Sequence, residues 1–216
     1  MMKHKTAILA CAVAATALVS LRVTAEPASP EEVIRTTSAK VIEVLADKSK
    51  TTEQKKTILD SYLDTCCDFV TISKLVMAKN WKSLKEDQQG EFIGLFRKYL
   101  VATYGDAIEN YSGETVEILS GRKEARDDYT VMTKIARGGG QADLLVDYRL
   151  RKAENGEWKL IDVIAEGISM VSNLRSQFQE VITREGTDGL LAQLREKTKS
   201  TASSGGSALA KTGAGA

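Results

Sequence analysis

The sequence predicts an α+β domain in which helices pack on the concave face of a four-stranded, strongly curved antiparallel sheet (a roll), with an apolar pocket between the two layers. Three observations predict this fold. Apolar residues follow helical spacing up to residue 111, alternate with a period of two between residues 115 and 164, and return to helical spacing after Gly167. A length of 216 residues, 43% of them apolar, suits one such domain with a substantial core.

Two helices are expected at the start of the domain. The first begins at Ser29, because the run Ser29-Pro30-Glu31-Glu32 supplies an N-cap residue, a proline in the first turn and a glutamate three residues after the cap. The second helix follows Thr52. Its apolar positions share one helix face and are Ile58, Leu59, Tyr62 and Leu63.

The longest helix is expected after Ser83, which forms the sequence pattern of a capping box with Glu86. A continuous apolar face follows, because the residues recur at intervals of three, four and seven. Core packing explains such a face and so does the lining of a pocket, since periodicity does not show what covers the face. The residues of this face are Phe92, Phe96, Tyr99, Leu100, Thr103, Tyr104, Ala107, Ile108 and Tyr111.

The period of two then predicts four strands joined by short turns at Gly121, at residues 138–140 and at Asn155-Gly156. Short turns imply antiparallel neighbours. In the third strand Val146 and Tyr148 alternate with Asp147 and Arg149, which predicts one apolar and one solvated sheet face. The predicted strands are Thr115 to Leu119, Tyr129 to Ile135, Leu144 to Leu150 and Trp158 to Ile164.

The C-terminal part is expected to return to helix after Gly167 and to break at Gly186, before a last short helix that carries Leu190, Leu191 and Leu194. From Ser200 to Ala216, 15 of the 17 residues are Gly, Ser, Ala or Thr. Such a segment buries too little apolar surface to offset its ordering entropy, so residues 200–216 are predicted to form a disordered tail.

Residues 1–25 have the order of a secretory signal peptide: the cationic residues Lys3, His4 and Lys5, an uncharged stretch, and a small-residue cleavage site that ends at Ala25. Cleavage there leaves a mature domain of residues 26–199 ahead of the tail. It also leaves 27 basic against 29 acidic residues, a net charge of −2 that argues against nucleic acid as a partner. An uncleaved membrane anchor is the alternative.

Removal of this segment takes away His4, the only histidine of the chain. The mature domain then has no Ser-His-Asp or Cys-His machinery and no imidazole metal ligand, so no metal site is expected. One catalytic alternative stays open, in which Asp162 is a buried carboxylate of raised pKa in a small isomerase-like roll enzyme. A structural hydrogen bond is the competing explanation for Asp162, and a helix cap for Ser169.

Cys66 and Cys67 are the only cysteines outside the leader, and adjacent cysteines can bridge only through a strained eight-membered ring. The pair is therefore a small buried pair, a vicinal disulfide or a source of intermolecular bridges. We expect burial.

One stretch carries a specific resemblance. The run from Trp158 to Val171, followed by Arg175, Gln177-Phe178 and residues 186–190, closely resembles the MlaC family of periplasmic phospholipid-binding proteins, also known as toluene-tolerance auxiliary proteins. The resemblance covers residues 30–197. Two departures are Ala78, where the family usually has glycine, and the Cys66-Cys67 pair, in a stretch where it often has proline. Further residues at the family's spacing are Asp68, Phe69, Trp81, Gln88, Phe92, Phe96, Leu100 and Tyr104.

The resemblance implies a monomeric periplasmic carrier without enzymatic activity, whose cargo is a phospholipid and which needs no cofactor. Its implied partners are an outer-membrane lipoprotein complex and an inner-membrane ABC transporter. Two acyl tails hold about 30 methylene groups, and at ~0.8 kcal/mol each their shelter from water is worth on the order of 20 kcal/mol. A hopanoid or another apolar lipid is the alternative cargo.

The tails are expected to enter between the long aromatic helix and the sheet. Core packing is the competing explanation for every residue of this candidate lining. The candidates are Leu75, Val76, Trp81, Phe92, Phe96, Leu100, Tyr104, Val146, Tyr148, Ile161, Val163, Met170 and Phe178.

Overall fold

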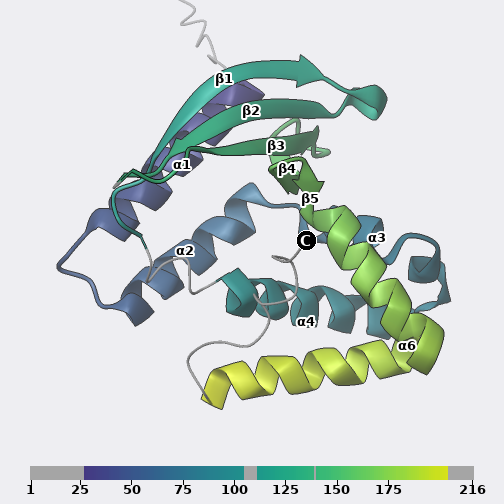
Figure 1. The fold of residues 1–216 in the computed structure, drawn as a ribbon. Coiled ribbons are helices and arrows are strands. Elements are labelled where there is room, and N and C mark those ends of the chain that lie inside the picture. The colour runs from purple at the N-terminus through teal and green to yellow at the C-terminus, as the bar shows by residue number, and fades with distance from the viewer. Residues whose placement is uncertain (1–26, 105–110, 139, 204–216) are drawn as a thin grey trace, which may run out of the picture.

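A computed structural model describes residues 27–104, 111–138 and 140–203 and shows an α+β fold in which a curved antiparallel sheet arches over a layer of helices (Figure 1). The predicted fold class is confirmed. The predicted leader, residues 105–110 of the predicted long helix, and residues 204–216 of the predicted tail lie outside the described residues. Residues 200–203, also predicted as tail, instead belong to helix α6.

The helices begin where local hydrogen bonds satisfy their first amide groups. Ser29 caps α1 as predicted, since its hydroxyl accepts from the Glu32 amide at 3.2 Å. The Ser83 capping box is not formed, because α4 begins at Glu86 and the Gln88 side chain accepts from the Lys85 amide at 3.0 Å. The helices are α1 (Pro30–Ala46), α2 (Thr52–Cys66), α3 (Phe69–Met77), α4 (Glu86–Tyr104) and α6 (Met170–Ser203), with 3-10 turns at Ala78–Ser83 and Ala125–Asp127.

Helix α6 is two helical segments in one element, because Gly186 has φ 73° and ψ 179°. This backbone conformation is open to glycine and rarely to other residues, so the predicted break at Gly186 is confirmed. Helix α3 was absent from the predicted elements. Its nine residues do place Phe69, Ile72 and Val76 at helical spacing, and it follows a cap in which the Asp68 carboxylate accepts from the Thr71 amide at 2.8 Å.

The sheet has five strands in the order β1-β2-β3-β4-β5, each antiparallel to its neighbour. Four of them correspond to the predicted strands, but the predicted turn at Gly121 is wrong, because β1 continues to Lys123 and the turn lies at Ala125–Asp127. The fifth has two residues and returns from β4 through a tight turn at Glu166 (φ 49°) and Gly167 (φ 79°). The strands are β1 (Thr115–Lys123), β2 (Tyr129–Ala136), β3 (Leu144–Lys152), β4 (Trp158–Ala165) and β5 (Ile168–Ser169).

The strand register places the apolar residues on the concave face. Val131 pairs with Tyr148 and Tyr148 with Val163, so these three side chains share one face of the sheet. The pair Arg149 and Asp162 lies on the opposite, convex face. Register shifts occur after Ile118 in the pairing of β1 with β2 and after Arg149 in that of β3 with β4. Such bulges bend strands, which explains the curvature of the sheet.

The packed apolar residues form two clusters. The larger lies among α3, α4 and α6, with Ile161 of β4 at its edge. The smaller lies where α1 crosses the concave face, with Ile34 against Val131 and Leu150. Helix α2 lies beneath the sheet on the same side as α1 (Figure 1).

Candidate functional site

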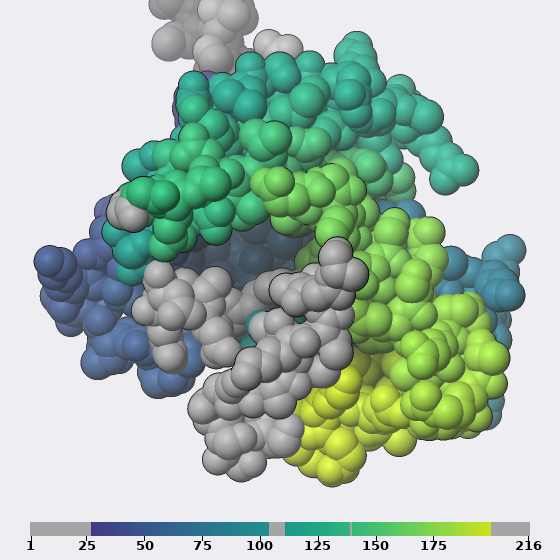
Figure 2. All heavy atoms as spheres, in the orientation of Figure 1, coloured from purple at the N-terminus to yellow at the C-terminus, as the bar shows by residue number. Residues whose placement is uncertain are grey.

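Helix α2, which faces the concave side of the sheet, differs from the other helices because none of its apolar side chains is fully buried. No residue of α2 is fully buried, although the helix carries the apolar stripe predicted for it. The molecule is visibly hollowed beneath the strands, with part of α2 exposed inside the hollow (Figure 2). The half-buried apolar residues are Ile58, Leu59, Tyr62 and Leu63 on α2, and Ile118, Ile135, Leu144, Tyr148 and Val163 on the sheet.

Most of the predicted lining residues lie in the larger cluster instead. Phe92 and Phe96 of α4 are fully buried and stack with ring centroids 5.5 Å apart. Phe178 of α6 packs edge-on against them at 6.1 and 5.9 Å. Contacts within the protein account for the burial of these rings. The predicted residues in this cluster are Leu75, Val76, Trp81, Phe92, Phe96, Leu100, Ile161, Met170 and Phe178.

Three predicted residues lie on the concave face. Val146 is 4% exposed, while Tyr148 and Val163 are half-buried. Burial raises the pKa of the Tyr148 phenol, since the interior disfavours the phenolate. The side chain of Tyr104 lies outside the described residues. The α2 stripe was predicted as a helix face but not as lining, because its spacing is the same as that of any core-facing helix.

Ionic contacts hold α2 against the neighbouring elements. The Arg97 guanidinium of α4 makes a two-pronged contact with the Asp64 carboxylate, at 2.7 Å through Nε and 3.0 Å through Nη2. Its Nη2 also lies 3.0 Å from the Asp60 carboxylate. At the end of α2, the Lys159 ammonium of β4 donates to the Thr65 carbonyl at 2.6 Å. Polar contacts thus supplement apolar contacts that are incomplete.

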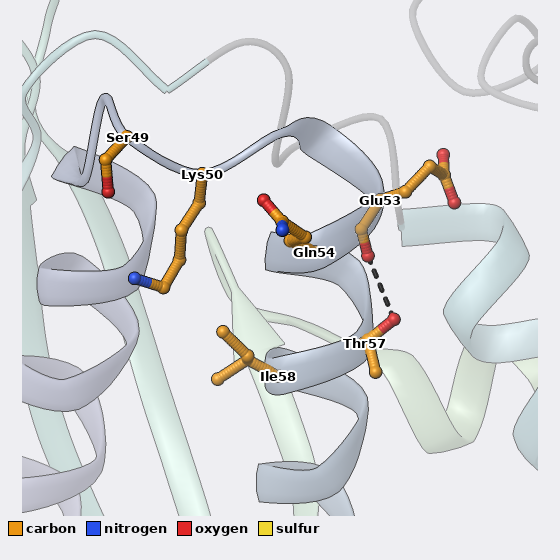
Figure 3. Close-up of a pocket in the computed structure, with 6 residues that line it drawn as sticks. All are labelled: Ser49, Lys50, Glu53, Gln54, Thr57 and Ile58. Carbon is orange, nitrogen blue, oxygen red and sulfur yellow. Dashed lines mark hydrogen bonds between the residues drawn. The ribbon is translucent and has the colours of Figure 1, made fainter.

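A pocket of about 530 Å³ opens at the N-terminal end of α2 (Figure 3). Ile58 points into it from α2, and the other lining residues are polar or charged. A second pocket, of about 870 Å³, lies between Ala78 and the first half of α6 and includes Arg175 and Arg184. Neither pocket includes a predicted lining residue. The first is lined by Ser49, Lys50, Glu53, Gln54, Thr57 and Ile58.

Asp162 has a structural role on the convex side of the sheet. Its carboxylate is 2% exposed and accepts from the Ser169 hydroxyl at 2.6 Å and the Val171 amide at 3.0 Å. Arg149 lies 3.5 Å away. Ser169 in turn accepts from the Ser172 amide at 3.0 Å, so the predicted cap of α6 is formed. These contacts hold the start of α6 on β4 and turn Asp162 away from the concave face, which speaks against the isomerase alternative.

Two further features are absent from the described residues. No cluster of three or more His, Cys, Asp or Glu side chains there is arranged to hold a metal ion. No helix within the described part of the chain is both long and apolar enough to cross a bilayer.

Known proteins are similar to this chain in both sequence and fold. The family model described as MlaC protein matches residues 35–196. The chain is 24% identical over 123 residues to the intermembrane phospholipid transport system binding protein MlaC of Haemophilus influenzae, a match that covers 56% of this chain and 58% of that relative. It is 26% identical over 168 residues to toluene tolerance protein ttg2D of Pseudomonas putida, covering 74% and 76%.

A solved structure has the same architecture. It is that of a phospholipid-binding protein from Ralstonia solanacearum in complex with a phospholipid. The TM-score is 0.71 at 25% sequence identity, with 81% of this chain and 99% of the other chain covered.

Proposed function

Since the chain belongs to the MlaC family, we propose that it binds a phospholipid and shelters the acyl tails between α2 and the concave face of the sheet. The solved relative of similar fold contains a bound phospholipid, which supports this cargo. The observation that carries the proposal is the half-burial of every apolar residue of the α2 stripe beneath a sheet face that is itself apolar. Contact with two acyl tails completes that burial.

The energetics favour this layer over the aromatic cluster as the binding site. Sheltering about 30 methylene groups is worth on the order of 20 kcal/mol, so a carrier needs apolar surface that the protein has left uncovered. The rings of Phe92, Phe96 and Phe178 already cover one another. A tail entering there displaces existing contacts, whereas a tail beneath the sheet adds new ones.

The carrier is proposed to act in the periplasm, as a soluble intermediate between an outer-membrane lipoprotein complex and an inner-membrane ABC transporter. The names of the relatives support this setting, since one belongs to an intermembrane phospholipid transport system. The proposal requires no catalytic residue, and Asp162 is already engaged as a helix cap.

Native mass spectrometry of the protein after periplasmic expression, followed by lipid extraction, tests the proposal. The expected result is a protein mass raised by one phospholipid. An extracted polycyclic lipid would identify a hopanoid as the cargo instead. A ligand-free mass with no extractable lipid contradicts the carrier function.

A pair of variants on β3 locates the binding site. Tyr148→Asp places a carboxylate on the concave face and is expected to abolish lipid co-purification, because a buried charge next to an acyl tail is strongly unfavourable. Leu145→Asp is the matched control, since Leu145 lies on the same strand, on the opposite face, and is 52% exposed. Far-ultraviolet circular dichroism checks that both variants fold.

A variant on α2 keeps this test informative if Tyr148→Asp fails to fold. Ile58→Asp removes an apolar side chain from a helix that contributes no fully buried residue, so the fold is expected to persist while lipid is lost. Full lipid retention by both folded variants would contradict the site.

A further inference from the structure

The junction between α2 and α3 holds two adjacent thiols. Cys66 is the last residue of α2, and the amide of Cys67, the C-cap residue, donates to the Leu63 carbonyl at 2.9 Å. Both thiols are free and half-buried, and their Sγ atoms are 3.6 Å apart. The expected burial is thus only partial. Cys67 packs against the edge of the larger apolar cluster, and neither cysteine lines one of the two pockets.

We propose that Cys66 and Cys67 form a reversible redox site, which closes to a vicinal disulfide by exchange with a disulfide oxidant and opens again on reduction. This inference is independent of lipid binding. Two observations carry it: the closeness of two free thiols on half-buried residues, and their position at the end of a helix that has no fully buried residue.

The exchange proceeds in two balanced steps. The Cys66 thiolate attacks one sulfur of the oxidant, forms a mixed disulfide and releases the other half of the oxidant as a thiol. Cys67 then loses its proton and attacks Cys66 Sγ, which forms the bond between the two residues and releases the second thiol. The chain loses two electrons and two protons, and the oxidant is reduced to two thiols.

The first attack is assigned to Cys66, because the Lys159 ammonium, which donates to the neighbouring Thr65 carbonyl at 2.6 Å, favours its thiolate. The hydrogen bond between the two thiols lowers the pKa of Cys66, and Lys159 lowers it further. The same hydrogen bond and burial raise the pKa of Cys67. Since the thiolate is the attacking species, Cys66 reacts with the oxidant and Cys67 resolves the mixed disulfide.

Adjacency makes the bridge easy to reduce. Consecutive Cα atoms across a trans peptide are about 3.8 Å apart, below the roughly 4.4–6.8 Å that disulfides usually span. A bridge forced into this spacing is strained, and strained disulfides belong to the labile class rather than the structural one. The pair is therefore suited to reversible oxidation.

Closure of the ring also moves the end of α2. The sulfur atoms must approach from 3.6 Å to about 2 Å, within a ring that contains the peptide joining the last helical residue to its cap. The backbone of Cys67 forms an isolated β-bridge with Leu160 of β4, and the Asp68 amide donates to the Leu160 carbonyl at 3.0 Å. These contacts fix the β4 side of the junction, so the last turn of α2 is the part that yields.

Thiol labelling of the purified chain in glutathione buffers tests the redox site. The protein is equilibrated at graded ratios of oxidised to reduced glutathione, quenched with iodoacetamide and cleaved with trypsin. Residues 57–74 carry both thiols in one tryptic peptide, which separates them from Cys11. The expected product under oxidising conditions is this peptide without label and lighter by two hydrogen atoms, and dithiothreitol restores the doubly labelled form.

The two single cysteine variants separate the two steps of the exchange. Cys67→Ser is expected to stop at the glutathione adduct on Cys66, and Cys66→Ser to react more slowly with glutathione disulfide. A wild-type peptide that stays doubly labelled, takes up two glutathiones or forms only intermolecular bridges overturns the proposal.

Hydrogen exchange tests the movement of α2. Oxidation is expected to speed amide exchange at least several-fold in the last turn of α2, because the bond from the Cys67 amide to Leu63 is strained or lost. The Cys66→Ser/Cys67→Ser double variant controls for oxidation elsewhere and is expected to show no change. Unaltered exchange in a fully oxidised wild-type protein would refute the coupling to α2.

Discussion

The cluster among α3, α4 and α6 and the layer between α2 and the sheet are built from similar residues but packed to different extents. In the first, Phe92 and Phe96 are fully buried against each other. In the second, Tyr62 and Tyr148 remain half-buried. Aromatic and aliphatic composition alone therefore does not mark a binding site. A binding site is instead marked by apolar surface that the protein leaves uncovered in its interior.

The two regions also differ in how they are held together. The helical cluster is stabilised by close contact between rings, whose loss leaves a cavity. Helix α2 is held by partial burial, by the ion pair of Arg97 with Asp64 and by the hydrogen bond from Lys159 to the Thr65 carbonyl. Substitutions in the first region are thus expected to change stability, and substitutions in the second to change lipid retention.

Phe96→Ala is expected to have the largest effect on stability. Removal of a fully buried phenyl ring costs about 3–5 kcal/mol in comparable cores, because the neighbouring rings cannot collapse into the space. Urea denaturation followed by circular dichroism measures the change. If Phe96→Ala instead kept its stability and lost its lipid, the ring would line the cavity and the contrast between the two regions would fail.

Asp162→Ala is expected to rank second, at about 2–3 kcal/mol of destabilisation, because it leaves the Val171 amide without an acceptor and removes the partner of the Ser169 hydroxyl at the start of α6. Thermal unfolding measures it. The comparison variant is Asp143→Ala, whose carboxylate is exposed and lies 3.7 Å from Lys134, and which should stay within about 0.5 kcal/mol of wild type. Equal effects would show that Asp162 does not join the sheet to the helical cluster.

The contrast between these regions was only partly readable from the sequence. Alternation in Val146-Asp147-Tyr148-Arg149 predicted which sheet face is apolar, because a strand has no other way to separate the two sets of side chains. Periodicity likewise predicted the buried face of α4. Periodicity did not distinguish Phe96, which other rings cover, from Ile58, which is half-buried, because both residues follow helical spacing.

Other features were missed for separate reasons. Strand β5 has only two residues and displays no period, whereas the helical spacing of Phe69, Ile72 and Val76 in α3 is present in the sequence but was not assigned to a helix. The predicted cap of α4 at Ser83 is wrong, because the Ser83 hydroxyl donates to the Asn80 carbonyl at 2.7 Å while the Gln88 side chain accepts from the Lys85 amide.

A matched pair of arginine variants probes the attachment of α2 with a smaller effect. Arg97 forms a bidentate ion pair with Asp64 of α2, and Arg195 forms one with Glu91 of α4 at 2.6 and 2.7 Å. Each Ala variant is expected to lose about 1 kcal/mol or less, since both pairs are partly exposed. Only Arg97→Ala should speed hydrogen exchange in α2 and lipid transfer to acceptor vesicles. Similar acceleration by Arg195→Ala would show that α2 is no looser than the helical cluster.

The smallest expected effect concerns the ionisation of Tyr148. Its pKa is raised by burial in the folded protein, so the neutral phenol is favoured there and the unfolded chain ionises first as the pH rises. The stabilisation is fully present below the unfolded pKa of about 10 and is lost as the pH rises through the folded pKa. Tyr148→Phe should therefore lose less stability than wild type over this alkaline range, as measured by urea unfolding at each pH. Bound lipid excludes more water from the phenol and should widen the difference; an unchanged difference would place the lipid away from Tyr148.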